Sequence, residues 1–271
     1  MTTYELILQN WHLNIFALII TTALIIFHIV TNQYKLTRKS IYFFSGVSLF
    51  ILSTFSSLDF LGRNYLFSAH MIEHIIILLV IPPLLLTGTS KEFLSRVFSK
   101  PKAAKFGNII FNPIVAWFLG VGSMWFWHIP YFFRLMKSYP SIHLIQMISL
   151  LVLGIIFIWP VFTPIKLRKL EPLNSSLYLF SACVGCTVLG IFITFAPAGM
   201  YTAYYYGSNK VVLNMIQNDW GITPDIDQQM GGLIMWVPAC IVYLTNILIT
   251  LSKWYNIQEV ENSDEILLHK G

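Results

Sequence analysis

Charged residues are scarce in this sequence: Asp, Glu, Lys and Arg make up 11% of its 271 residues, whereas hydrophobic residues make up 56%. A soluble globular domain usually carries about 25% charged residues. The mean hydropathy of +0.68 is correspondingly high. This composition excludes an ordinary soluble domain and indicates a chain that lies in a lipid bilayer.

Cysteine is scarce too, with three residues, all inside apolar segments: Cys183, Cys186 and Cys240. Such placement excludes the disulfide framework of a small secreted protein. Cys183 and Cys186 have CxxC spacing but are surrounded by small residues. We therefore interpret them first as helix-packing residues, with a copper relay as the alternative.

Basic residues are absent ahead of the first apolar run, which starts near Trp11, so we expect no cleaved signal peptide. The formal net charge is +5, but Lys and Arg form no stripe with aromatic residues between them. The sequence therefore does not indicate nucleic acid as a partner.

Seven long apolar runs remain, and each is close to the roughly 20 residues that a helix needs to cross a bilayer. The runs cover residues 11–31, 41–58, 66–87, 109–129, 139–162, 174–197 and 228–252. They lack the alternation of polar and apolar residues that barrel strands require. We therefore predict an all-α fold, a polytopic membrane bundle of seven transmembrane helices that forms a single domain over residues 1–271.

The orientation of the bundle follows from its basic residues. The connections on one side hold 13 of the 17 Lys and Arg residues, and such connections face the cytoplasm. We predict that the N-terminus lies outside and that the tail, residues 253–271, is cytoplasmic. The longest connection, residues 198–227, would then lie outside with several tyrosines and a short interfacial helix near residues 210–218.

The clearest local pattern is His70-Met71-Ile72-Glu73-His74 at the outer end of the third run. Spacing of i, i+4 places the two imidazoles on one helical face, and Glu73 follows His70 by three residues. A carboxylate inside the membrane boundary is costly unless it binds or pairs with something. The pattern predicts a metal site.

A second segment repeats this spacing with His143, Gln146 and Met147 in the positions of His70, Glu73 and His74. A thioether beside imidazoles forms a soft ligand set that suits Cu(I). Other candidate ligands fall at the same predicted depth: His12, His128, Asp227 and Met230. We expect these residues to converge on one outward-facing pocket.

At these residues the chain resembles the CtaG family of Gram-positive cytochrome c oxidase assembly factors, which are seven-helix membrane proteins. The resemblance covers most of the chain and rests on four motifs: His70–His74 followed by Pro82, Pro83 and Gly88; Trp125–Pro130; the His143 segment ending in Trp159-Pro160; and Asp227–Pro238. The chain departs from the family pattern at Gln146 and Met147. The resemblance implies a role in forming the copper centre of a heme-copper oxidase in the bacterial cytoplasmic membrane.

The leading hypothesis is therefore a non-enzymatic assembly factor that holds Cu(I) at the extracytoplasmic face and passes it to an oxidase subunit. An extracytoplasmic copper donor would supply it. The candidate ligands are His70, His74, Glu73, His128, His143, Met147, Asp227 and Met230. We assign no catalytic residue and no organic cofactor.

Two other functions stay open. In a copper permease, the three cysteines would bind copper in the middle of the membrane during its transport. His70–His74 also matches the HxxEH motif, in which Glu73 would be the general base of an intramembrane metalloprotease.

Overall fold

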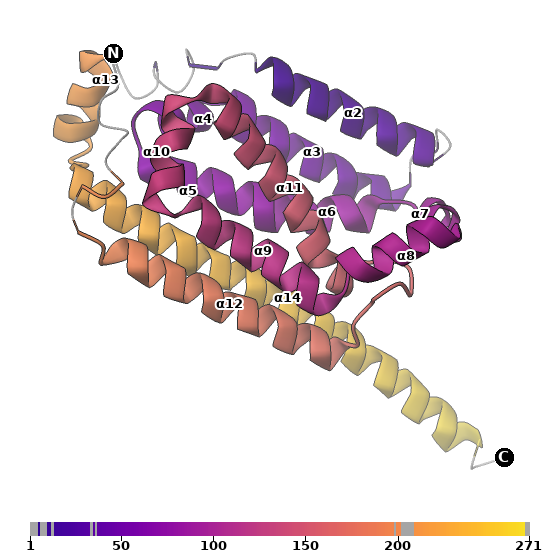
Figure 1. Cartoon of the computed structure of the whole chain (residues 1–271). Coiled ribbons are helices and arrows are strands. Elements are labelled where there is room, and N and C mark those ends of the chain that lie inside the picture. Colours follow the sequence, from indigo (N-terminus) through magenta and orange to yellow (C-terminus); the bar gives the residue numbers. More distant parts are fainter. Residues whose placement is uncertain are drawn as a thin grey trace.

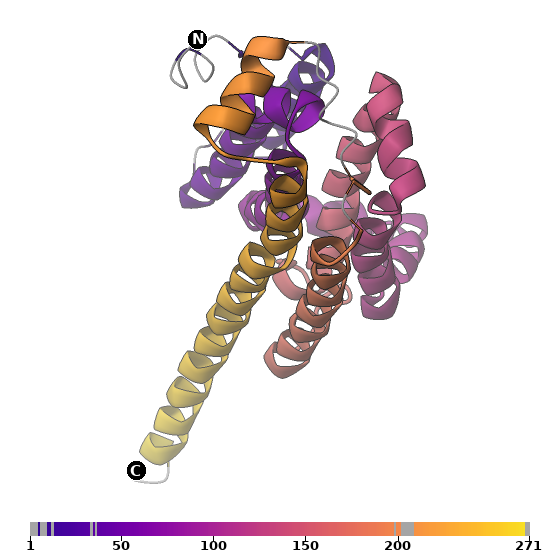
Figure 2. The same ribbon diagram turned by 90° about the vertical axis from the view of Figure 1, so that its left-hand side faces the viewer.

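The computed structural model describes residues 5, 10–11, 14–32, 35, 37–197, 199–201 and 209–268. Every regular element among these residues is a helix, which agrees with the predicted all-α class. The helices form a bundle, and the C-terminal part of the last one extends beyond the others (Figures 1 and 2).

Four helical segments are long and apolar enough to cross a membrane: Phe67–Gly88, Pro140–Phe162, Pro172–Thr194 and Pro224–Ser252. Two further candidates are bent pairs, so the described residues hold up to six spans by this measure. Helix α2 (Ile15–Thr31), in the first predicted run, has 17 residues, at the lower limit for crossing a bilayer. The chain is thus a membrane protein, while the count of seven spans and their orientation stay predictions.

The two bent pairs replace continuous predicted helices. Helix α3 (Arg38–Phe55) meets α4 (Ser57–Asn64) at 47°, and α8 (Pro101–Ile110) meets α9 (Pro113–Trp127) at 57°. Each new helix starts at a side-chain cap: Ser56 accepts from the Leu58 amide, and Asn112 accepts from the Ile114 amide. Capping side chains and the missing N–H of Pro113 explain why the chain turns there.

The third span consists of three joined segments, α5 (Phe67–Ile75), the π-helical turn η1 (Ile76–Val80) and α6 (Ile81–Gly88). Pro82 and Pro83 lie in the first turn of α6. Proline lacks an N–H and cannot continue the regular pattern of backbone hydrogen bonds. The π turn accommodates the missing hydrogen bonds, so that α5, η1 and α6 form one continuous helix.

The remaining elements complete the bundle. The short helices α7 (Lys91–Phe98) and α10 (Pro130–Ser138) lie between spans. Helix α11 (Pro140–Phe162) packs against α9 and η1. Helix α12 (Pro172–Thr194) lies along α14. The predicted short helix after residue 209 is present as α13 (Lys210–Asn214) followed by η3 (Met215–Asp219). Helix α14 (Pro224–Leu268) starts before residue 228 and continues past residue 252 into the predicted tail. The tyrosines at 204–206 lie outside the described residues.

Candidate metal centre

Four histidines from three parts of the bundle meet in its interior. Helix α5 supplies His70 and His74, α11 supplies His143, and His128 is the residue that ends α9. The His70 ring centre lies 4.1 Å from that of His74 and 5.8 Å from that of His143. The ring centres of His74 and His128 are 5.4 Å apart. All four side chains are at most 4% exposed, so the predicted convergence of these histidines is present.

Glu73 lies in the same cluster, as the helical spacing predicted. Its Oε2 is 3.7 Å from His70 Nδ1. One ligand atom each of His70, Glu73 and His143 fall within 4.8 Å of one another. Ligands around one ion at about 2.1 Å are up to about 4.2 Å apart, so small side-chain rotations bring these atoms to coordinating distance.

Several polar atoms in this cluster are buried with no hydrogen bond, or only a weak one, to a described residue. Nε2 of His143 has none, and the polar atoms of Glu73, His74 and Gln146 have only a weak contact between Glu73 and Asp59 and another between His74 and Gln146. Each such atom costs about 1–3 kcal/mol when nothing satisfies it. A concentration of imidazole, carboxylate and amide donors of this kind fits a metal ion better than it fits a packed core.

His128 has a defined tautomer. Its Nδ1 lies 2.5 Å from the carbonyl oxygen of Met124, which can only accept a hydrogen bond, so Nδ1 carries the proton. The lone pair is then on Nε2, which lies 3.1 Å from the sulfur of Met71. A hydrogen bond to the backbone that orients the ring is the usual support of a metal-binding histidine. Met71 was not predicted, because its helical position gave no reason to face His128.

An acidic residue that we did not predict borders the cluster. Helix α4 packs on α5 and places the Asp59 carboxylate beside Glu73. Asp59 is fully buried and accepts from Arg63 Nε at 2.7 Å. The predicted second span ended at residue 58, so Asp59 was assigned to a loop. An acidic residue at the edge of an apolar run is unusual, and this position of Asp59 was the feature of the sequence that could have indicated a site residue.

Aromatic residues cover one side of the cluster. Phe67, Phe133 and Tyr201 pack with ring centres 4.9–5.4 Å apart, and Phe133 lies 6.4 Å from His70. The Tyr201 hydroxyl donates to the carbonyl oxygen of His128 at 2.7 Å. Burial raises the pKa of Tyr201, which keeps this hydroxyl a neutral donor. The cover therefore ties the loop before α13 to the end of α9.

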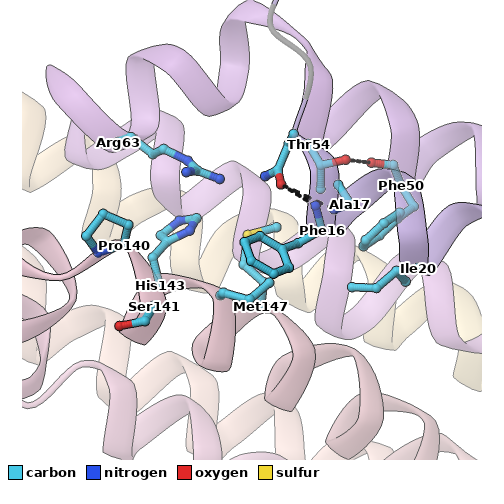
Figure 3. Close-up of a pocket in the computed structure, with 12 residues that line it drawn as sticks. Phe16, Ala17, Ile20, Phe50, Thr54, Arg63, Pro140, Ser141, His143 and Met147 are labelled. Carbon is cyan, nitrogen blue, oxygen red and sulfur yellow. Dashed lines mark hydrogen bonds between the residues drawn. The ribbon is translucent and has the colours of Figure 1, made fainter.

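A pocket of about 240 Å³ reaches the cluster beside α2. Figure 3 shows Arg63, His143 and Met147 among the side chains that line it. Asn14, which caps α2, and Thr54 line it as well. His143 is thus the member of the cluster that this pocket reaches.

The other predicted ligands occupy different positions. Asp227 is buried, and its two carboxylate oxygens accept from the amides of Phe67 and Ser68 and from the Ser68 hydroxyl, at 2.5–3.0 Å. Met147 lines the pocket, whereas Met230 is 37% exposed on α14. Their roles as ligands stay predictions, and His12 lies outside the described residues.

Comparison with known proteins agrees with the resemblance seen in the sequence. Neither a curated protein nor a solved structure matches this chain. The family model of the cytochrome c oxidase caa3 assembly factors, Caa3_CtaG, matches residues 11–256. The match extends over all four histidine positions described above and over most of the chain. The protein therefore belongs to the family of cytochrome c oxidase caa3 assembly factors.

Proposed function

We propose that this assembly factor binds Cu(I) in the buried histidine cluster and delivers it to the oxidase subunit that carries the copper centre. The observation that carries the proposal is the meeting of His70, Glu73 and His143 within 4.8 Å of one another, with His74 beside them. Family membership supports oxidase assembly as the purpose.

The surroundings of the histidines favour Cu(I) over harder cations. The sulfur of Met71 lies next to His128, and the Met147 side chain lines the pocket with His143. Thioethers and imidazoles are soft or intermediate ligands and suit Cu(I), whereas Mg²⁺ and Ca²⁺ prefer sites made of oxygen atoms.

Delivery requires that the ion leave the site again. The pocket at His143, which residues of α2 and α4 help to line, would supply a route. Ligands from several helices allow stepwise exchange, because a small movement of α11 withdraws His143 while His70 and His74 stay together on α5.

The test combines genetics with copper binding. Deletion of the gene should leave the caa3-type oxidase with its heme but without its copper. Complementation with His70→Ala/His74→Ala should behave like the deletion, and the purified double variant should bind one Cu(I) fewer than the wild type. Substitution of a residue that only supports a metal ligand typically lowers affinity about 10-fold to 100-fold, so loss of two ligands should lower it by more.

A matched control is available in His28, an equally buried imidazole in α2 that contacts Asn32. His28→Ala should restore the oxidase. Unchanged copper binding by the double variant would refute the ligand assignment, and a fully metallated oxidase in the deletion strain would refute the delivery role.

A further inference from the structure

Three free thiols gather between α12 and α14, apart from the histidine cluster. The Sγ atoms of Cys183 on α12 and Cys240 on α14 are 2.6 Å apart. Thr187 lies one turn further along α12, and its hydroxyl is 3.3 Å from Cys240 Sγ. Both cysteines of the pair are half-buried. They lie well inside their spans, far from either end.

Two further sulfurs extend this cluster into the bundle. Cys186 Sγ is 3.4 Å from the Met124 sulfur of α9 and 3.4 Å from the Tyr243 hydroxyl. Cys186 and Met124 are at most 2% exposed. Four sulfur atoms from three helices thus lie in one region of the bundle. We call Cys183, Cys186, Cys240 and Met124 the sulfur cluster.

Glycines hold the two helices that carry the thiols close together. A Cβ atom at Gly190 would lie 2.9 Å from the carbonyl oxygen of Gly232, and one at Gly232 would lie 2.7 Å from the Thr194 amide nitrogen. Small residues allow such close backbone contact between membrane helices. The helix pair therefore keeps Cys183 and Cys240 within reach of a common ligand.

We propose that Cys183 and Cys240 bind a second Cu(I) ion, with Cys186 as a third sulfur ligand. Thiol and thioether sulfur select Cu(I) among the available metals. Binding forms one copper–thiolate bond to Cys183 and one to Cys240, both thiols lose their protons to solvent, and no electron is transferred.

A binding ion requires the two sulfurs to move apart, to roughly 4 Å, about twice a metal–thiolate bond. Both side chains are only half-buried, so rotation about a Cα–Cβ bond allows this. Cys186, one turn after Cys183 on α12, is buried inside the bundle and would complete the site from there.

A chain of side-chain and backbone contacts connects this site to the histidine cluster. Met124 contacts Cys186 through its sulfur and His128 through its carbonyl oxygen. His128 in turn contacts Met71 and faces His74. Copper exchange between the two sites along this line rests on the proposed function, but binding at the sulfur cluster does not.

The test is anaerobic Cu(I) titration of the full chain in detergent, with bicinchoninate as competitor and X-ray absorption to identify the ligands. The wild type should bind two equivalents and show copper–sulfur scattering. Cys183→Ser/Cys240→Ser should lose one equivalent of Cu(I) and most of the copper–sulfur scattering. His70→Ala/His74→Ala should still bind the equivalent held by the cysteines and should still show copper–sulfur scattering. The two pairs of variants therefore distinguish failure of this site from failure of the proposed function.

Two controls keep the outcome decisive. Cys183→Met/Cys240→Met retains sulfur ligands and should bind the second Cu(I) more weakly, which separates loss of a ligand from loss of the fold. Alkylation of the denatured, metal-free wild type should modify three thiols. In the folded protein, bound Cu(I) should protect Cys183 and Cys240 from alkylation. The proposal would be overturned if the serine variant bound as much Cu(I) as the wild type. It would also be overturned if the denatured wild type had a single reactive thiol, because this would indicate a disulfide between two of the cysteines.

Discussion

At the scale of single residues, Asp227 shows how one helix fixes the position of a site on another. Helix α5 begins after Leu66, whose side chain provides no capping hydrogen bond. Asp227 of α14 accepts from the Phe67 and Ser68 amides instead, which satisfies two of the free N–H groups at the start of α5. Its negative charge also lies at the positive end of the α5 dipole. Asp227 thereby anchors the helix that carries His70.

We predict that Asp227→Ala destabilises the protein by about 2–4 kcal/mol, because two buried amides and the Ser68 hydroxyl lose their acceptor. Thermal unfolding in detergent and Cu(I) titration measure the two consequences, a lower midpoint and weaker copper binding. Asp225→Ala, an exposed carboxylate in the same first turn, is the matched control and should change neither. An unaltered midpoint for Asp227→Ala would contradict the capping role.

At the scale of helices, the position of the cluster depends on the packing of α11 against the third span. The Cα of Gly154 faces the π turn, and a Cβ there would lie 2.5 Å from the Leu78 carbonyl oxygen and 2.7 Å from Pro82. This contact packs α11, which carries His143, against the span that carries His70 and His74. The close approach requires glycine, since the nearest atom belongs to the backbone and cannot rotate away.

Gly154→Ala should therefore push α11 away from the third span, at a cost of about 1–3 kcal/mol. We expect a midpoint lowered by several degrees and weaker Cu(I) binding, although the substitution touches no ligand. Gly122→Ala is the matched control, because a Cβ at Gly122 meets nothing within 4 Å. Equal behaviour of the two variants would show that the packing of α11 does not position His143.

At the scale of the whole molecule, the distribution of basic residues determines the direction in which the bundle is inserted. Of the 17 Lys and Arg residues, 13 are in the connections assigned to the cytoplasm. On this prediction, α7 and α8 lie on the cytoplasmic side and α10 lies on the outer side. The histidine cluster would then lie toward the outside.

Two exposed serines test this orientation. Ser138→Cys at the end of α10 should react with an impermeant maleimide in intact cells, while Ser99→Cys between α7 and α8 should react only after permeabilisation. The wild type, whose cysteines lie within apolar spans, gives the background. The reverse labelling pattern would place the cluster on the cytoplasmic side and exclude delivery outside the cell.

The sequence by itself determined those features that depend on local chemistry. Apolar length identified a helical membrane protein, because a bilayer demands long runs without charge. The helical period placed His70, Glu73 and His74 on one face of a helix, and the repeated spacing identified His143 on another. The structure confirms that these four side chains lie together.

Tertiary structure decided which residues from distant segments meet. The bend at Ser56 brings Asp59 to Glu73, and the rotation of α14 places Asp227 at the start of α5 and Cys240 against Cys183. Such contacts depend on the crossing and rotation of whole helices, which are set by many small packing contacts spread along the chain. For this reason no local pattern in the sequence contained them.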